Sequence, residues 1–323
     1  MKKLIVEQPG GPEQMKLVDS ELPTPGPNDA LVRIAYSGVN FIDVYFRTGL
    51  YKADLPVTLG SEASGVVERV GAEVTDVAAG DRVAYAMVRG SYAEYALVPA
   101  AQLVKVPDNV GLDTAAAVML QGMTAHYLTH STFPLAPGHA CLVHAAAGGT
   151  GGLIVQMAKH RGARVFGTTS TEDKAKEVRR LGADAAIIYT KQDFEAEVKR
   201  LTDNRGVDVV YDSVGKTTFD KSLASIRPRG TMALFGQSSG SVPPFDPTIL
   251  NARGSLYLTR PSLAHYMLDR KELAWRAGDV MTYIANGIIN VRIDKTYPLV
   301  EAASAHLDLE GRRTLGKLLL KVH

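Results

Sequence analysis

The sequence has one cysteine among its 323 residues, and this scarcity excludes two ways of stabilising a small fold. Cys141 has no second cysteine with which to form an intrachain disulfide, and a zinc module built on several cysteines is excluded as well. A chain of this length buries enough surface to form a core without such links. We expect the lone thiol to stay reduced in the cytoplasm.

Long apolar runs and an excess of one charge are missing too. No stretch reaches the roughly 18 uninterrupted apolar residues of a membrane span. The first apolar segment ends at Glu7, Gln8 and Pro9, so we expect no signal peptide. Lysine and arginine number 36 against 34 aspartate and glutamate, which gives a net charge of +2 without a block of like charge. We therefore expect a cytoplasmic protein with neither a membrane nor a nucleic acid as partner.

The pattern of the chain changes near residue 124. The first 123 residues contain short apolar or alternating runs separated by turn residues, as in a β-rich domain. Residues 124–265 alternate apolar strands with amphipathic helices, which predicts a parallel sheet with helices on both faces. Residues 266–323 contain a long helix at 272–286 and a β-like end. They are short for a separate domain, and we expect them to pack against the β-rich part.

A glycine-rich segment from His144 to Gly152 is the strongest chemical signal. Within it, Ala145, Gly148 and Gly151 have the spacing of a dinucleotide fingerprint, in which the backbone approaches a pyrophosphate and a helix N-terminus favours its charge. The first position is alanine instead of glycine, so the pattern is met in part, and a simple packing turn is the alternative. The strand–turn–helix context favours a nucleotide site.

The end of the next strand indicates which dinucleotide is favoured. An NAD site needs a carboxylate there, whereas this strand ends in Thr169 and Ser170, with Lys174 one turn into the following helix. Small hydroxyls and a cation suit a 2′-phosphate, so NADPH is favoured. Glu172 and Asp173 argue against this interpretation if they face the ribose, although they can also serve as first-turn acids of the helix. An ordinary solvated lysine is the alternative for Lys174.

Seven stretches spread over the whole chain carry a recognisable pattern. They are residues 38–51, 60–65, 79–83, 144–151, 209–215, 235–240 and 250–261. Together they resemble the NADPH:quinone oxidoreductases, the zeta-crystallin-like branch of the medium-chain dehydrogenase/reductase superfamily. The resemblance implies an α/β fold: a Rossmann doubly wound parallel sheet at 124–265, inserted in a GroES-like β-rich catalytic domain formed by 1–123 and 266–323. It also implies a homodimer, for which the apolar edge strand near 248–258 is our candidate contact.

The matched motifs imply two sets of site residues. Asn40, Tyr45 and Tyr51 are the candidate catalytic residues, as hydrogen-bond donors or positioning groups for a substrate oxygen. For each cofactor-binding residue, ordinary packing or solvation is the alternative. These residues, from the nicotinamide side to the adenosine 2′-phosphate and the rest of the cofactor wall, are Phe41, Ile42, Asp43, Tyr127, Gly148, Gly149, Thr150, Ser170, Lys174, Tyr189, Ser213, Phe235, Gly236, Gln237, Ser238, Leu258, Thr259, Arg260 and Arg312.

The metal ligands of the zinc alcohol dehydrogenases in the same superfamily are missing. Their Gly-His-Glu motif is Gly60-Ser61-Glu62 here, and no cysteine precedes Cys141. His126 and His130 have the i, i+4 spacing of two ligands on one helix face, but no third ligand is evident. We interpret them as polar helix-face histidines and expect no metal site.

The chemistry must then come from the nicotinamide, which favours hydride transfer from NADPH to a quinone. A quinone accepts negative charge on oxygen without a strong Lewis acid. The same cofactor geometry suits an NADPH-dependent enone or alkenal reductase, and the sequence does not decide between the two. A non-catalytic relative that binds NADPH or RNA is a third alternative, although the balanced charge argues against RNA. We expect no single side chain to be indispensable in the manner of a nucleophile.

Overall fold

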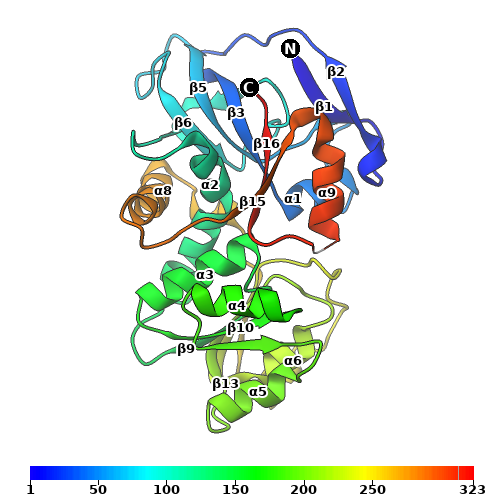
Figure 1. Cartoon of the computed structure of the whole chain (residues 1–323), viewed down its shortest axis with the longest axis vertical. Coiled ribbons are helices and arrows are strands. Elements are labelled where there is room, and N and C mark those ends of the chain that lie inside the picture. Colours follow the sequence, from blue (N-terminus) through cyan, green and yellow to red (C-terminus); the bar gives the residue numbers. More distant parts are fainter. Residues whose placement is uncertain (312) are drawn as a thin grey trace. The chain divides into compact units, whose positions relative to one another are not determined.

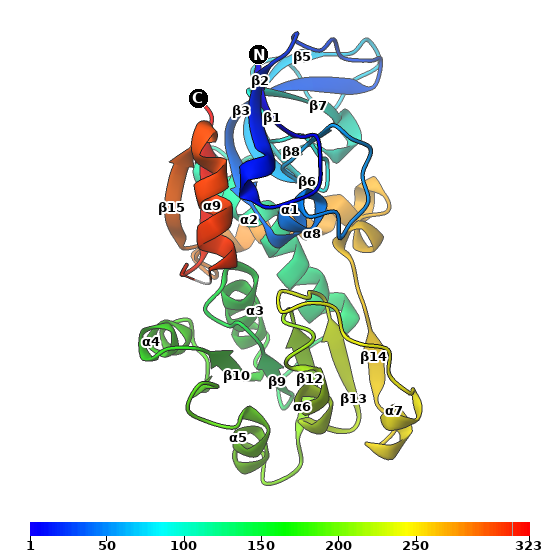
Figure 2. The ribbon, with the colours of Figure 1, turned by 90° about the vertical axis from the view of Figure 1, so that its right-hand side faces the viewer.

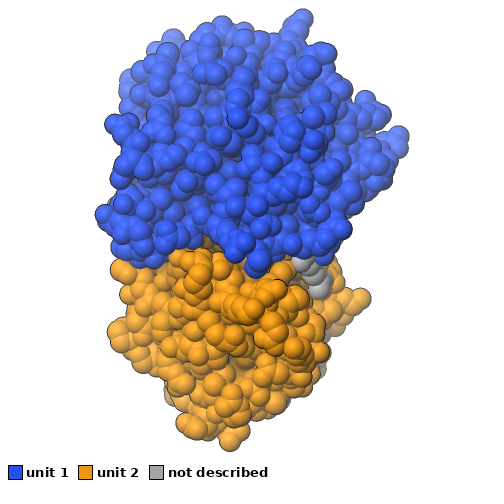
Figure 3. All heavy atoms as spheres, in the orientation of Figure 1, with its two compact units in different colours: residues 1–123, 267–323 blue, residues 124–266 orange. Residues whose placement is uncertain are grey.

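The computed structural model describes residues 1–311 and 313–323, which fall into two compact units (Figure 3). Unit 1 comprises Met1–Met123 with Met267–His323, and unit 2 comprises Thr124–Tyr266. The expected fold class is confirmed, since unit 1 is rich in antiparallel strands and unit 2 contains a parallel sheet with helices. Within the described part of the chain, none of the helices combines the length and the apolar character that crossing a membrane requires.

Unit 1 is built on two β-sheets (Figure 1). The smaller has the strand order β2-β1-β4, and the larger has the order β15-β16-β3-β5-β6-β8, with β7 paired to β3. The strands of the smaller sheet are β1 (Lys2–Val6), β2 (Met15–Asp19) and β4 (Val57–Thr58). Those of the larger are β3 (Asp29–Val39), β5 (Glu62–Val70), β6 (Arg82–Ala86), β7 (Tyr95–Pro99), β8 (Val104–Lys105), β15 (Ile293–Pro298) and β16 (Lys317–Lys321).

Helices flank these sheets, and the helix that follows β3 begins with a capping box. At the start of α1 (Phe41–Arg47), the Asp43 carboxylate accepts the backbone N–H of Asn40 at 3.0 Å, as in a capping box. Figures 1 and 2 both show α9 (Ala302–Glu310) alongside β15. The remaining helical segments of unit 1 are α8 (Arg270–Ala285), α2 (Leu112–Tyr127), whose last residues belong to unit 2, and the short η1 (Pro12–Gln14), η2 (Ala100–Gln102) and η5 (Leu299–Glu301).

The register of the larger sheet brings three polar residues to one end. β16 pairs antiparallel with β3 so that Leu318 lies opposite Val39, which places Lys317 next to the residue that follows β3, Asn40. β3 pairs antiparallel with β5 so that Ser37 lies opposite Ala63, and Glu62 at the start of β5 therefore comes to the same end. Strand pairing, rather than sequence proximity, assembles this group.

Unit 2 contains a parallel sheet with the strand order β11-β10-β9-β12-β13-β14. The chain moves outward from β9 through β10 to β11, then returns to β12 on the other side of β9 and moves outward again. Since parallel crossovers are right-handed, the helices of the two halves cover opposite faces of the sheet. The strands are β9 (Ala140–Val143), β10 (Arg164–Thr169), β11 (Ala185–Ile188), β12 (Val207–Asp212), β13 (Ile226–Leu234) and β14 (Tyr257–Thr259).

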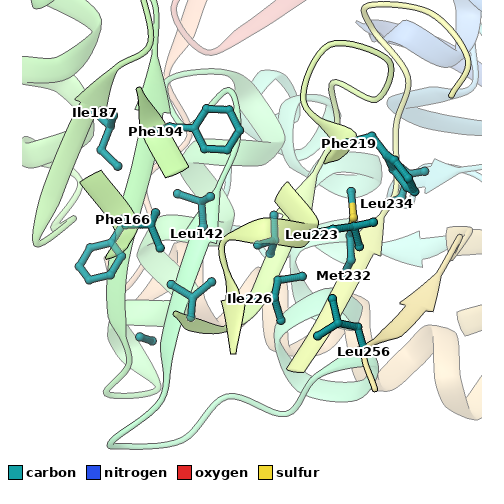
Figure 4. Packing of buried hydrophobic residues seen from close by; sticks show 14 residues of the cluster. Leu142, Phe166, Ile187, Phe194, Phe219, Leu223, Ile226, Met232, Leu234 and Leu256 are labelled. Atoms are coloured by element: carbon teal, nitrogen blue, oxygen red, sulfur yellow. The ribbon is translucent and has the colours of Figure 1, made fainter. Parts of the chain in front are cut away.

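The core of this sheet is apolar and closely packed (Figure 4). Leu142, Phe166 and Met232 lie in three different strands and are almost fully buried, which is typical of strands covered on both faces. The helices that follow β11 and β12 contribute Phe194 and Leu223 to the same cluster. The helices are α3 (Gly149–His160), α4 (Glu172–Arg180), α5 (Phe194–Leu201), α6 (Phe219–Ala224) and α7 (Thr248–Ala252), with the short η3 (Leu128–Thr132) and η4 (Leu263–Tyr266).

Candidate functional site

Most of the predicted cofactor-binding residues of unit 2 follow the carboxyl ends of its strands. Because every pair in this sheet is parallel, those ends lie at the same edge. The topological switch lies between β9 and β12, where open α/β sheets bind their ligands. The residues gathered at this edge are Gly148, Gly149, Thr150, Ser170, Tyr189, Ser213, Phe235, Gly236, Gln237, Ser238 and Arg260.

The glycine-rich turn between β9 and α3 has the shape that a bound phosphate requires. Gly148 is the N-cap of α3, and no side chain caps the first N–H groups of the helix. A Cβ atom on Gly151 would lie 2.3 Å from the backbone oxygen of Ala145, so only glycine permits this close packing. Ala145, at the first fingerprint position, adopts φ of 49°, a left-handed conformation uncommon for alanine. The turn therefore offers uncapped N–H groups and the positive end of a helix to an anion.

A second polar group lies where β10 and β11 end. Thr169 Oγ1 is buried and has no hydrogen-bond partner among the described residues, although a buried hydroxyl is normally satisfied. Ser170 follows it, and Tyr189 follows the adjacent strand, with its backbone N–H donating to the Thr169 oxygen at 3.0 Å. Lys174 lies in the first turn of α4, which Thr171 caps by accepting the Lys174 backbone N–H. Hydroxyl groups at a strand end that is followed by a lysine-bearing helix fit a phosphorylated ribose.

The two acids that could oppose this interpretation are both engaged elsewhere. Lys191 Nζ donates to Glu172 at 2.9 Å, and Lys176 Nζ donates to Asp173 at 3.0 Å. Both carboxylates lie in the exposed first turn of α4, where acidic groups also favour the helix dipole. Each carboxylate therefore already has a lysine partner, and neither needs a ribose hydroxyl.

Buried polar side chains hold the loops at this edge of the sheet in place. Asp212, at the end of β12, accepts the backbone N–H groups of Val214 and Gly215 and the hydroxyls of Thr218 and Ser222. His144 Nε2 lies 2.9 Å from the Ser222 hydroxyl, and burial lowers the pKa of this histidine. The arrangement fixes the loops after β9 and β12, and its full burial gives His144 a structural role.

Three further predicted residues occupy less direct positions. Tyr127, at the end of α2, is buried, and its ring stacks on Tyr266 with centroids 4.2 Å apart. Leu258 and Thr259 lie within β14 and pair with β13 instead of following a strand end. The predicted residue Arg312 lies outside the described residues.

In unit 1, the predicted aromatic residues gather around α1. The rings of Tyr45 and Tyr51 have centroids 5.1 Å apart, and the Tyr51 backbone N–H donates to the Tyr45 oxygen at 3.0 Å. Phe41 lies next to Tyr45, with centroids 6.3 Å apart. Phe41, Ile42 and both tyrosines are only partly buried. A cluster of partly exposed aromatic rings thus lies along α1 and the turn that follows it.

Asp43 faces the interior instead, which differs from its expected place beside the nicotinamide. Its carboxylate accepts the hydroxyl of Ser61 at 2.8 Å, the backbone N–H of Asn40 at 3.0 Å and the hydroxyl of Tyr92 at 3.3 Å. Full burial raises the pKa of Asp43 to about 7, against the lowering effect of these hydrogen bonds. Since the side chain has no exposed surface, we assign it to the support of α1.

Asn40 belongs to a buried group, here called the Lys317 cluster, which consists of Asn40, Glu62, Gln121 and Lys317. Lys317 Nζ donates to Glu62 Oε2 at 2.6 Å and to Asn40 Oδ1 at 2.7 Å, and neither charged residue is exposed. Gln121 Nε2 donates to Asn40 Oδ1 at 3.2 Å. Sequence reasoning missed Lys317 and Gln121; the one available signal was a lysine at the start of the apolar run 318–320.

This donor set does not fit a metal ion. Glu62 is already paired with the Lys317 ammonium, which repels a cation, and the neighbouring Ser61 hydroxyl is committed to Asp43. Across the described residues, no group of three or more histidine, cysteine, aspartate or glutamate side chains could hold a metal ion. His126 and His130 stack on each other with ring centroids 4.0 Å apart.

Comparisons with known proteins agree with this geometry. The alcohol dehydrogenase GroES-like domain matches residues 26–108, and the zinc-binding dehydrogenase family matches residues 149–272. A 2-haloacrylate reductase of a Burkholderia species is 43% identical, covering 98% of this chain and 97% of its own. A quinone oxidoreductase of Pseudomonas aeruginosa is 44% identical, covering 96% of each chain. The structure of Escherichia coli quinone oxidoreductase complexed with NADPH superposes with a TM-score of 0.98 at 40% identity, covering 100% of both chains.

Proposed function

The chain belongs to the quinone oxidoreductase family of the medium-chain dehydrogenase/reductase superfamily, and from this membership we propose that it reduces quinones with NADPH. The observation that carries the proposal is the carboxyl edge of the unit 2 sheet. An uncapped helix N-terminus and an unpaired hydroxyl beside a lysine-bearing helix meet there, as a phosphorylated dinucleotide requires.

The residues of unit 2 bind and orient the cofactor. The N–H groups at Gly149 and Thr150 receive the pyrophosphate at the start of α3. Ser170, Lys174 and Tyr189 hold the 2′-phosphate, which the free hydroxyl of Thr169 adjoins. Ser213, Phe235, Gly236, Gln237 and Ser238 line the rest of the edge, where a Cβ atom on Gly236 would lie 2.6 Å from the Ser213 oxygen. We expect these contacts to favour NADPH over NADH.

In unit 1, the phenolic hydroxyls of Tyr45 and Tyr51 donate hydrogen bonds to an oxygen of the bound quinone. When bound, NADPH supplies a hydride, and one further proton completes the reduction of a quinone to a hydroquinone. A neutral tyrosine hydroxyl donates hydrogen bonds and stabilises charge that develops on oxygen. Asn40 takes a different part, because its amide hydrogens already reach Gly38 O and Glu62. It holds the end of β3 in place.

The proposal is tested by following NADPH oxidation with 1,4-benzoquinone, 9,10-phenanthrenequinone and an α,β-unsaturated ketone in parallel. We expect turnover with the quinones and faster turnover with NADPH than with NADH. Tight NADPH binding without turnover of any acceptor would overturn the proposal in favour of a binding protein.

Reduction of an activated carbon–carbon double bond is the second candidate function. It is favoured by one observation, the 43% identity to a protein named 2-haloacrylate reductase. The same tyrosine hydroxyls serve that reaction by holding the carbonyl or carboxylate next to the double bond. A higher kcat/KM for 2-chloroacrylate than for every quinone would make this the principal activity.

We also propose that the protein works in the cytoplasm as a homodimer. β14 forms one edge of the unit 2 sheet, and Tyr257 on it is 64% exposed, which leaves an apolar edge open to a second copy. Light scattering of the purified chain tests the dimer, and Tyr257→Lys is expected to yield monomers.

A further inference from the structure

The Lys317 cluster contains an acceptor that nothing in the chain satisfies. Gln121 Oε1 is buried and has no hydrogen-bond partner among the described residues, whereas its amide nitrogen donates to Asn40. Leaving a buried acceptor unpaired is unfavourable, so this oxygen calls for a donor that the described residues do not supply.

The two charged ends of the cluster dictate how its amides are oriented. An ammonium only donates and a carboxylate only accepts, so Asn40 must turn Oδ1 to Lys317 and Nδ2 to Glu62, as observed at 2.7 and 2.9 Å. Asn40 Oδ1 in turn requires a donor from Gln121. The orientation of Gln121 is thereby fixed, with its oxygen directed away from Asn40. Exchanging the oxygen and nitrogen positions of either amide group would bring two donors or two acceptors face to face.

The backbone around the cluster is adapted to it. A Cβ atom on Gly38 would lie 2.2 Å from Glu62 Oε2, so the carboxylate occupies space that only glycine leaves open. The other oxygen of Glu62 accepts the backbone N–H of Leu120 at 2.6 Å, which ties the carboxylate to the helix that carries Gln121. The cluster therefore has one rigid arrangement.

We propose that Lys317 and Glu62 are positioning residues that present Gln121 Oε1 as an acceptor for an O–H or N–H group of a bound reactant. This inference rests on the proposed function, which supplies two sources of such a group. One is the O–H of the hydroquinone product, and the other is the amide N–H of the nicotinamide. Neither group has to be charged, since the acceptor is a neutral carbonyl oxygen.

The test compares ligands with and without the donor. For the hydroquinone arm, calorimetry on the full chain with NADP+ measures the affinities for 1,4-naphthalenediol and its dimethyl ether under anaerobic conditions. For the cofactor arm, it compares NADPH with its 3-acetylpyridine analogue, which lacks the amide hydrogens. One buried hydrogen bond predicts a preference of about threefold to tenfold for the donor-bearing ligand in one arm.

Gln121→Leu is expected to abolish that preference. It removes the hydrogen bond to Asn40 together with the unsatisfied oxygen, so the melting temperature is measured alongside to establish that the variant is folded. Gln102→Leu is the matched control, because Gln102 Oε1 is also buried and unpartnered in unit 1 but lies outside the cluster. This control should keep the wild-type preference. If Gln121→Leu keeps the preference in both arms, the inference is wrong.

The positioning part is tested by the double variant Glu62→Gln/Lys317→Met, which leaves no unpaired buried charge. It should lose the same preference as Gln121→Leu, and Lys317→Arg, which retains a donor-only cation, should keep it. A folded double variant with the wild-type preference would refute the positioning role. Should the double variant fail to fold, loss of the preference in folded Lys317→Arg refutes it instead. Wild-type turnover of quinones, measured on the same preparations, shows separately whether the proposed function fails.

Discussion

At the scale of single residues, the sequence alone identifies the candidate cofactor-binding residues but not the charged pair of the Lys317 cluster. Gly148, Gly151 and Ser170 were predicted because their roles follow from a local pattern of strand, turn and helix. Lys317 and Glu62 are 255 residues apart and meet only through strand pairing, so no local pattern points to them. A buried lysine is recognisable once its partner is known, which requires the fold.

Tyr51→Phe tests whether catalysis depends on one hydroxyl. We expect kcat with a quinone to fall by less than about tenfold, because removing one neutral hydrogen bond costs about 0.5–1.5 kcal/mol. NADPH affinity should be unchanged. Complete loss of activity in a variant that still binds NADPH would show that Tyr51 is indispensable.

Lys174→Ala tests the proposed 2′-phosphate site. A hydrogen bond to a charged group contributes about 1.5–3 kcal/mol, so the Kd for NADPH should rise about tenfold to a hundredfold, with the Kd for NADH unchanged. Lys176→Ala, on the same helix but paired with Asp173, is the control and should leave both constants unchanged. An equal effect of the two variants would contradict the assignment of Lys174.

At the scale of elements, the parallel sheet of unit 2 was predicted well because apolar strands and amphipathic helices alternate in the sequence. The shorter elements of unit 1 were not. α1 carries apolar and polar residues without a clear helical pattern, and the local capping box between its N-cap Asn40 and Asp43 was not recognised in the sequence. The apolar edge strand expected near 248–258 is shorter and later: β14 begins only at Tyr257, because Gly254 and Ser255 adopt positive φ values of 105° and 56°.

Gly151→Ala tests the packing of α3 against the turn. The new Cβ atom would lie 2.3 Å from the Ala145 oxygen, so the turn must shift. We expect about 1–3 kcal/mol lower stability in chemical denaturation, together with weaker NADPH binding. Gly278→Ala in α8 meets nothing within 4 Å and should instead stabilise the chain by about 0.5–1 kcal/mol. Unchanged stability in Gly151→Ala would contradict the close packing.

At the scale of the whole molecule, the family, the two-part organisation and the cofactor class could be inferred from the sequence, because they rest on motifs spread along the chain. The buried polar network of unit 1 could not. Arg47 Nη1 lies 3.0 Å from His306 Nδ1, and His306 Nε2 lies 3.0 Å from the Tyr92 hydroxyl, which donates to Asp43. This network joins α1 to α9 across 259 residues of sequence.

The network gives the free energy of unfolding a defined pH dependence. Burial lowers the pKa of His306 from 6.5 to about 3 in the folded chain. Because the folded pKa is depressed, the contribution of His306 is complete above pH 6.5 and is lost as the pH falls toward 3. We therefore expect His306→Gln to lose less stability than the wild type between pH 6.5 and about 4, measured by chemical denaturation.

The pKa of Asp43 is shifted in the opposite direction from that of His306, so its effect on the free energy of unfolding has the opposite pH dependence. Burial raises its pKa to about 7, so its contribution is complete below 3.8 and is lost as the pH rises through 7. Asp43→Asn should flatten that loss between pH 3.8 and about 7. Identical pH profiles for the wild type and both variants would show that neither group is titrated as the buried network requires.

A crystal structure of the chain with NADPH bound is the most direct test of the central claim, that the carboxyl edge of the unit 2 sheet is an NADPH site. We predict the pyrophosphate at the N–H groups of Gly149 and Thr150, and the 2′-phosphate in contact with Ser170, Lys174 and Tyr189. A dinucleotide bound elsewhere, or a 2′-phosphate that contacts only solvent, would contradict the account.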